Sequence, residues 1–209
     1  MRTKINKEDW SRREHFEFFN SFEEPFFGVC VRINCTKAYK TAKEKNYSFF
    51  LYYLHASISA VNQTEAFRYR IGENNEVYLY DVIHPSATIS RPDDTFGFCY
   101  MKYREDFEDF CTSVKPEIEK VQNMSGLNPS GKDDKDVVHY SAIPWIDFQS
   151  LSHARSYYYK DSCPKISFGK LVKEGEEYFM STSVHVHHAL MDGKHVGEYI
   201  ERFKTRMDG

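Results

Sequence analysis

The chain has 209 residues, of which 41% are hydrophobic and 16% aromatic, and its formal net charge is −3. This length and apolar fraction fit one domain, residues 1–209, with a packed core, and they exclude a disordered protein. The near-neutral charge, the lack of an apolar run of ~20 residues and the polar first residues argue against nucleic-acid, membrane and secreted functions. The five scattered cysteines are expected to be reduced thiols in a cytoplasmic protein.

The first third of the sequence predicts three helices and one strand. Asn6 or Asp9 is placed to cap a first helix, but an arginine at its start, Arg12, opposes the helix dipole and calls for a second explanation. The other predicted elements are a strand over residues 28–33, a polar helix from residue 36, and an apolar helix that Ser48 caps and that continues to Val61.

From residue 67 onward the hydrophobic period changes to two, which is typical of strands. The predicted strands are a hairpin over 68–71 and 77–80, then 87–89, 96–100, 137–141, 145–151, 165–172 and 178–186. The predicted helices are 105–121 and 195–203, and a polar loop covers 124–136. We expect an α/β fold, a two-layer sandwich with a mixed, largely antiparallel sheet covered by helices.

The stretch between the last strand and the last helix carries the clearest chemical signal. Residues 187–193 read HHALMDG, so a loop presents an imidazole and, four residues after His188, an aspartate. An imidazole held on such a loop can take a proton near neutral pH. Asp192 can orient a neighbour or complete an ion pair.

Three other interpretations of these histidines stay open. A histidine at a strand end is often only structural. A zinc site is disfavoured because His185 and His187 share one strand face while His188 faces the other way, so only two ligands converge. A serine–histidine–aspartate triad needs a nucleophile in a strained turn, but the sequence has no G-x-S-x-G motif, and Ser141 reads as an ordinary strand-end serine.

The HHALMDG stretch matches the HHxxxDG signature of CoA-dependent acyltransferases. Four further segments, in matching order over nearly the whole chain, resemble the chloramphenicol acetyltransferase family: residues 10–18, 60–63, 67–68 and 141–145. The resemblance implies an O-acetyltransferase that uses acetyl-CoA as co-substrate and no metal. It also implies a homotrimer whose active sites lie between subunits.

The resemblance further implies roles for individual residues. His188 would be the general base, Ser141 would donate a hydrogen bond to the oxyanion, and Ser167 stands where the family usually has threonine. Asp192 would pair with Arg12, which would account for the arginine at the helix start. On the CoA side, the resemblance points to Phe50 and Lys170.

The acceptor pocket is where this sequence departs from the family pattern. The resemblance assigns seven residues to that pocket: Phe19, Phe98, Asn128, Leu151, His153, Arg155 and Lys165. Four of these side chains are polar where the family has mostly aromatic and aliphatic groups. The acceptor is therefore expected to be chloramphenicol or a similar small hydroxyl compound, with two alternatives. One is a more polar acceptor, and the other is a catalytically idle binding protein of the same fold.

Overall fold

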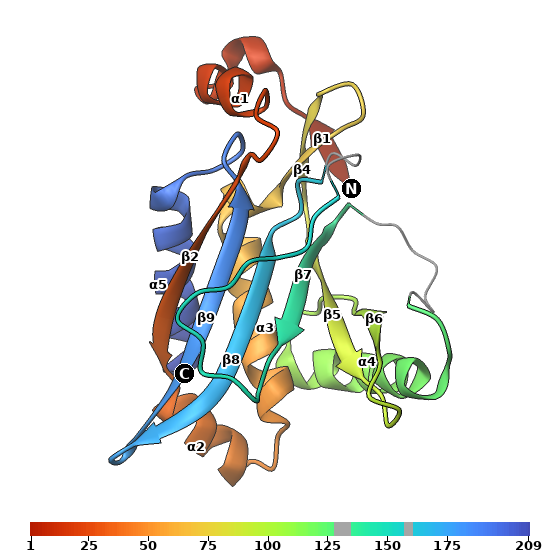
Figure 1. Ribbon diagram of the computed structural model, residues 1–209, viewed down its shortest axis with the longest axis vertical. Coiled ribbons are helices and arrows are strands. Elements are labelled where there is room, and N and C mark those ends of the chain that lie inside the picture. Colours follow the sequence, from red (N-terminus) through yellow and green to blue (C-terminus); the bar gives the residue numbers. More distant parts are fainter. Residues whose placement is uncertain (128–134, 157–160) are drawn as a thin grey trace.

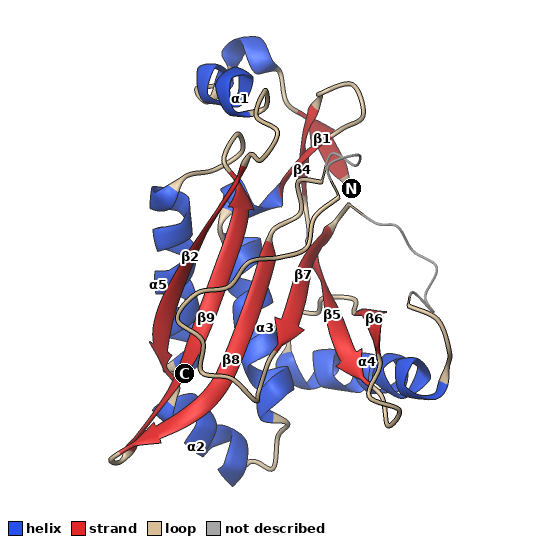
Figure 2. Ribbon diagram, in the orientation of Figure 1, coloured by secondary structure: helices blue, strands red, loops and turns tan. Residues whose placement is uncertain are grey.

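The computed structural model describes residues 1–127, 135–156 and 161–209, and its core is a six-stranded sheet with helices packed on one face (Figures 1 and 2). The strands of this sheet are β2 (Phe26–Asn34), β5 (His84–Ser90), β6 (Phe96–Tyr100), β7 (Val137–Ala142), β8 (Lys165–Glu174) and β9 (Glu177–His187). A smaller sheet is formed by β1 (Arg2–Lys4), β3 (Tyr69–Ile71) and β4 (Val77–Tyr80). The helices are α1 (Arg13–Phe19), α2 (Thr36–Glu44), α3 (Phe49–Gln63), α4 (Phe107–Asn123) and α5 (Gly193–Met207). None of these helices has the length and apolar character needed to cross a membrane.

The order of strands in the large sheet is β2-β9-β8-β7-β5-β6. Three neighbouring pairs are antiparallel, namely β2 with β9, β8 with β9, and β5 with β6. The two central pairs, β5 with β7 and β7 with β8, are parallel. The predicted two-layer fold with a mixed, largely antiparallel sheet is therefore confirmed.

The two faces of the sheet differ in chemistry because side chains alternate along each strand. Val184 and Val186 on β9 are fully buried in the core that the helices cover. In the same core, Ser57 of α3 bonds the hydroxyls of Tyr140 (2.9 Å) and Tyr199 (2.7 Å), joining a strand to two helices. Polar residues alternate with these core positions, so the helix-free face is the polar one.

A long connection from β7 to β8 crosses the helix-free face, in front of β8 and β9 in Figure 1. The strand predicted over residues 145–151 is wrong, because this connection contains no strand in that range. Both edges of β8 are already paired, with β7 and with β9, so the segment finds no free edge on this strand. It bonds β8 only beyond the end of β7, where the N–H of Lys170 donates to the carbonyl of Ile146 (2.9 Å).

The start of the chain also differs from the prediction in one respect. Asn6 caps only a short 3-10 turn, Lys7–Asp9, by accepting from the N–H of Glu8. α1 begins at Arg13, with Arg12 at its N-cap position and no side-chain capping bond. By contrast, Ser48 caps α3 as expected, accepting a hydrogen bond from the N–H of Leu51 (3.4 Å). The side chain of Arg12 therefore takes no part in capping α1 and is available for contacts outside the helix.

Candidate active site

The candidate site is centred on the loop of residues 188–192, which joins β9 to α5. The two adjacent histidines at its start point to opposite sides. The ring of His187 lies against Phe26 (5.3 Å between centroids), whereas the ring of His188 stacks on Phe19 (3.8 Å, 6° between planes) and contacts Phe27 (4.6 Å). This divergence follows from the strand alternation and leaves only one of the two rings in the aromatic site beside α1.

The His188 side chain is half-buried, and contacts on both sides restrict its position. Its backbone N–H donates to the carbonyl of Pro25 (2.8 Å), which ties the loop to the segment before β2. Its Nδ1 is buried and has no hydrogen-bond partner among the described residues. The stacked ring of Phe19 fixes the plane of the imidazole. A neutral imidazole held in this way can act as a general base on a group that reaches its other nitrogen.

Arg12 connects the start of the chain to this loop through three hydrogen bonds. Its Nη1 pairs with Oδ2 of Asp192 (2.7 Å), its Nη2 donates to the carbonyl of His188 (2.9 Å), and its Nε donates to the carbonyl of Ala189 (3.2 Å). The guanidinium is 11% exposed and the carboxylate 34%, so the pair is half-buried, not fully enclosed. The position of Arg12 at the start of α1 is therefore explained by its contact with Asp192, 180 residues away in the chain.

Asp192 serves α5 as well as Arg12. Its Oδ1 accepts from the N–H of Lys194 (3.0 Å) and lies 3.0 Å from Nδ1 of His195. Burial alone would raise the pKa of Asp192, but the hydrogen bond from Arg12, the charge of His195 and the N–H of Lys194 outweigh burial and lower this pKa to about 2. The carboxylate is ionised at neutral pH and holds the loop, the helix start and α1 together.

This depressed pKa predicts a specific loss of stability in acid. A carboxylate whose folded-state pKa is lowered stabilises the protein above its unfolded-state pKa, here the ordinary 3.8, and the effect is lost as the pH falls toward about 2. Asp192→Asn should lower the free energy of unfolding at pH 7 and flatten its decline between pH 4 and pH 2. Urea unfolding of both proteins across this range measures the difference. The matched control is Asp106→Asn, which changes the exposed N-cap of α4, and equal slopes in all three proteins would contradict the prediction.

The candidate oxyanion residues lie on the helix-free face. Ser141 on β7 is the register partner of Ser167 on β8, and Ser167 is the partner of Ser183 on β9, so the three form a row across adjacent strands, here called the serine row. The Ser167 hydroxyl is buried without a partner among the described residues, while the Ser183 hydroxyl bonds Nδ1 of His185 (3.0 Å). Sequence reasoning missed Ser183, because only the strand register aligns it with the other two.

A single chain does not bring His188 and the serine row together. His188 follows Ser183 by five residues, roughly 16 Å along a strand, and Ser141 lies two strand spacings, about 10 Å, to the side. His188 also contacts Phe27, whose register partner is the core residue Val186, so it lies toward the other face of the sheet. One small substrate cannot touch both groups of the same chain.

The predicted acceptor residues separate into groups. Phe19 stacks on His188, and Phe98 lies 38% exposed on the edge strand β6. Leu151 and His153 belong to the connection that crosses the helix-free face, where the His153 ring meets His185 (4.8 Å). Asn128 lies outside the described residues. Burial lowers the pKa of His153 to about 4, helped by the nearby charges of His185 and Lys165.

The two predicted pocket cations both have acidic partners. Arg155 forms an ion pair with Glu24, and Lys165 forms one with Asp161. Both cations also lie over the ring of Phe26, at 3.6 Å for the guanidinium and 4.9 Å for the ammonium. The expectation of a polar acceptor pocket rested partly on unpaired charges at these two side chains. Both charges are paired, so this part of the expectation is not met.

The two residues expected on the CoA side lie in different layers. Phe50 is half-buried in the first turn of α3, with its ring edge toward Tyr53 (5.7 Å). Lys170 is exposed on β8, beside an irregularity in the pairing with β9 between Phe168 and Leu171. Their part in cofactor binding stays a prediction.

The open alternative of a zinc site at the C-terminal histidines finds no support in the contacts of those side chains. Nδ1 of His185 bonds Ser183, and Nδ1 of His187 lies 3.3 Å from the N–H of Ala189. His195 is engaged by Asp192. Their rings are thus directed to protein groups and not to a common point.

Comparison with known proteins extends the resemblance to the full chain. The profile of the family described as chloramphenicol acetyltransferase matches residues 1–204. Chloramphenicol acetyltransferase 3 of Escherichia coli is 29% identical, over 97% of this chain and 95% of that protein. The chloramphenicol acetyltransferase of Bacillus pumilus is 28% identical, over 93% and 88%.

Solved structures agree with this assignment. A chloramphenicol acetyltransferase structure superposes with a TM-score of 0.90 at 27% identity, over 99% of this chain and 100% of that one. A catalytic core of the 2-oxoacid dehydrogenase complex from Thermoplasma acidophilum, at 16% identity and a TM-score of 0.68, covers 95% and 94% and shares the fold. The chain belongs to the chloramphenicol acetyltransferase family.

Proposed function

We propose that this protein transfers the acetyl group of acetyl-CoA to a hydroxyl of chloramphenicol, with His188 as general base and no covalent intermediate. The observation that carries the proposal is the clamped imidazole of His188, stacked on Phe19 and tied to Arg12 through its carbonyl, in a chain that matches the family over residues 1–204. The retained site argues against a catalytically idle binding protein. Release of free CoA thiol from acetyl-CoA on addition of chloramphenicol tests the proposal directly, and its absence would reject it.

The chemistry needs a base and an oxyanion donor but no metal, because a thioester is already activated. Neutral His188 takes the proton of the acceptor hydroxyl as the oxygen attacks the thioester carbon. Ser141 donates a hydrogen bond to the oxyanion of the tetrahedral intermediate. Collapse of the intermediate expels the CoA thiolate, which receives the proton back from the imidazolium. The ester and free CoA leave, and the base returns to its neutral form.

The active site is assembled between two copies of the chain in a homotrimer. The separation of His188 from the serine row supports this, because one copy cannot supply both groups to one acetyl transfer. Beside His188, the side chains of Phe18 (61% exposed) and Phe22 (45%) offer the aromatic surface typical of interfaces. The number three rests on the family.

Mixed oligomers give the sharpest test of this assembly. His188→Ala and Ser141→Ala chains, each strongly impaired alone, are expected to regain activity when refolded together, since mixed interfaces contain sites with both native residues. Sedimentation should give three copies of the 24.7 kDa chain. An active monomer, or a mixture as inactive as its components, would reject the shared site.

The acceptor pocket makes a prediction about stability and about affinity for chloramphenicol. His153 has a buried Nε2 without a partner among the described residues, and such an unpaired group costs about 1–3 kcal/mol. Because this nitrogen is buried before any acceptor binds, His153→Leu should raise the free energy of unfolding by that amount and leave the KM for chloramphenicol and kcat little changed, which urea unfolding and steady-state kinetics measure. His15→Leu, at an exposed position, is the control. An increase in KM would mean that His153 binds the acceptor.

That last outcome would favour the second candidate function, transfer to a more polar acceptor. The observation behind it is the row His139–Lys165–His185 across β7, β8 and β9, which gives this face a polar character. The pairing of Lys165 with Asp161 weakens the case for an anionic acceptor. A panel of hydroxyl compounds ranked by kcat/KM against chloramphenicol decides between the two acceptors.

A further inference from the structure

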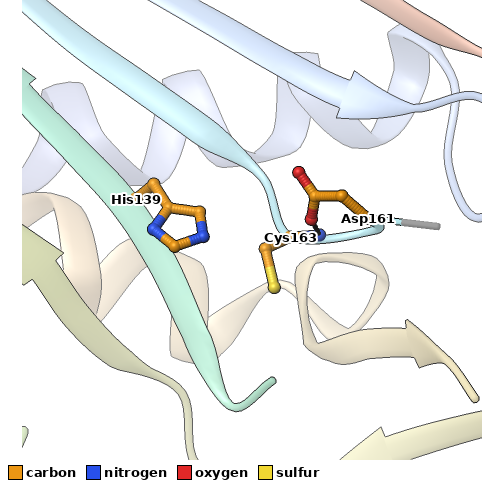
Figure 3. Close-up of side chains that lie close together, drawn as sticks. All are labelled: His139, Asp161 and Cys163. Atoms are coloured by element: carbon orange, nitrogen blue, oxygen red, sulfur yellow. Dashed lines mark hydrogen bonds between the residues drawn. The ribbon is translucent and has the colours of Figure 1, made fainter. Parts of the chain in front are cut away.

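Three side chains with metal-ligand atoms gather where β7 and β8 run side by side. His139 lies on β7, and Asp161 and Cys163 lie in the segment that enters β8 (Figure 3). The imidazole nitrogen, the carboxylate oxygen and the thiol sulfur all lie within 4.8 Å of one another. Over residues 1–127, 135–156 and 161–209, this is the one such group of three.

The donor set determines which ion fits. One nitrogen, one sulfur and one carboxylate oxygen are ligands of zinc-class ions, whereas magnesium and calcium prefer oxygen alone. In a tetrahedral zinc site, bonds of about 2.0–2.3 Å place ligand atoms roughly 3.5 Å apart, so the three atoms need to close by only about 1 Å. We propose that His139, Asp161 and Cys163 bind one zinc-class divalent ion, with water in the fourth position.

The neighbouring charges are compatible with such an ion. Oδ1 of Asp161 already accepts from the N–H of Cys163 (2.8 Å) and Oδ2 pairs with Lys165, so the carboxylate is held in place with lone pairs to spare. Burial would raise the pKa of Asp161, but Lys165, the N–H of Cys163 and His139 together outweigh burial, and the net shift is downward. The first anionic ligand is therefore present before the ion arrives.

The thiol is the group that changes on binding. Burial raises the pKa of Cys163, while the nearby guanidinium of the fully buried Arg70 acts to lower it. In the free protein the sulfur is protonated and faces the carbonyl of Lys135 (3.6 Å). The ion replaces the thiol proton, which leaves to solvent, so binding releases one proton and strengthens as the pH rises.

The position of the ion has a consequence for catalysis, which rests on the proposed function although the binding itself does not. His139 precedes Ser141 by two residues on the same face of β7, and Lys165 precedes Ser167 in the same way on β8. An ion bound to Asp161 adds positive charge next to Lys165 and so changes the charge beside the serine row. Zinc is then an inhibitor that raises the KM for the acceptor.

Cobalt(II) is the probe for the binding claim, because a thiolate–cobalt bond gives a near-ultraviolet charge-transfer band that zinc abolishes by displacement. The full-length protein should show this band at one equivalent of cobalt, and Cys163→Ser should lose it. Cys111→Ser, on α4, is the matched control and should keep it. His139→Gln and Asp161→Asn should each weaken cobalt binding at least tenfold, since even supporting residues of metal sites contribute about 10–100-fold.

Each result decides the proposal. A band that survives in Cys163→Ser, or that disappears in Cys111→Ser, overturns the assignment, as does the absence of any band in the unsubstituted protein. Circular dichroism checks that the variants fold. If Cys163→Ser does not fold, unchanged cobalt affinity in His139→Gln and Asp161→Asn overturns the proposal, and a tenfold loss in both supports it.

Discussion

Replacing His188 with alanine is expected to lower kcat by about 10²–10⁴-fold, the contribution of a positioned general base. The acceptor hydroxyl then has no group to take its proton as it attacks the thioester. The KM for acetyl-CoA should change little, because the imidazole contacts Phe19 and Phe27 and the cofactor is expected to lie elsewhere. Steady-state kinetics with both substrates varied, on protein whose folding is verified by thermal unfolding, measures the split.

The neighbouring histidine provides the matched control. His187 is buried against Phe26, and its Nδ1 lies 3.3 Å from the N–H of Ala189. His187→Asn keeps an acceptor near that N–H, so it should lower stability while leaving most of kcat. If His187→Asn were inactive and His188→Ala nearly normal, the assignment of the base would be wrong.

Local sequence signals predicted most of the helices and strands, because these elements are determined mainly by residues close together in the chain. The apolar face of α3 and its Ser48 cap lie within 16 consecutive residues, and the hairpin of β3 and β4 is equally local. The false strand over 145–151 had the right alternation. Whether such a segment pairs depends on which strand edges are free, and the second edge of β8 is taken by β9, which comes later in the sequence than β8 itself.

The distinction between local signals and contacts of distant segments also applies to the candidate site. The HHALMDG loop and the unfavourable position of Arg12 at a helix start were both visible in the sequence. Their contact joins residues that lie 180 positions apart. The neutralisation of Arg155 could not be predicted, because its partner Glu24 lies 131 residues away and, unlike Asp192, belongs to no recognisable motif. The cluster of His139 with Cys163 was likewise invisible, since no regular spacing marks it and only the parallel pairing of β7 and β8 joins its parts.

Ser141→Ala is expected to lower kcat by about 10²–10³-fold, the cost of removing one oxyanion donor. Unlike a nucleophile, an oxyanion donor leaves no covalent trace. No acetylated Ser141 should be found by mass spectrometry after rapid quenching, and initial rates should indicate a ternary complex and not a ping-pong mechanism. An acetyl-serine at this position would contradict the assignment.

The serine row supplies the comparison that separates this role from general damage to the sheet. Ser183 is the register partner of Ser167 on the neighbouring strand, but its hydroxyl is already bonded to His185 (3.0 Å). Ser183→Ala should therefore cost stability more than turnover. Ser167 has a buried, unpartnered hydroxyl, so Ser167→Ala should fold normally and lose part of kcat. If Ser183→Ala reduced kcat as strongly as Ser141→Ala, the loss would come from damage to the sheet and not from a missing oxyanion donor. The two serines have only their position in the same sheet in common.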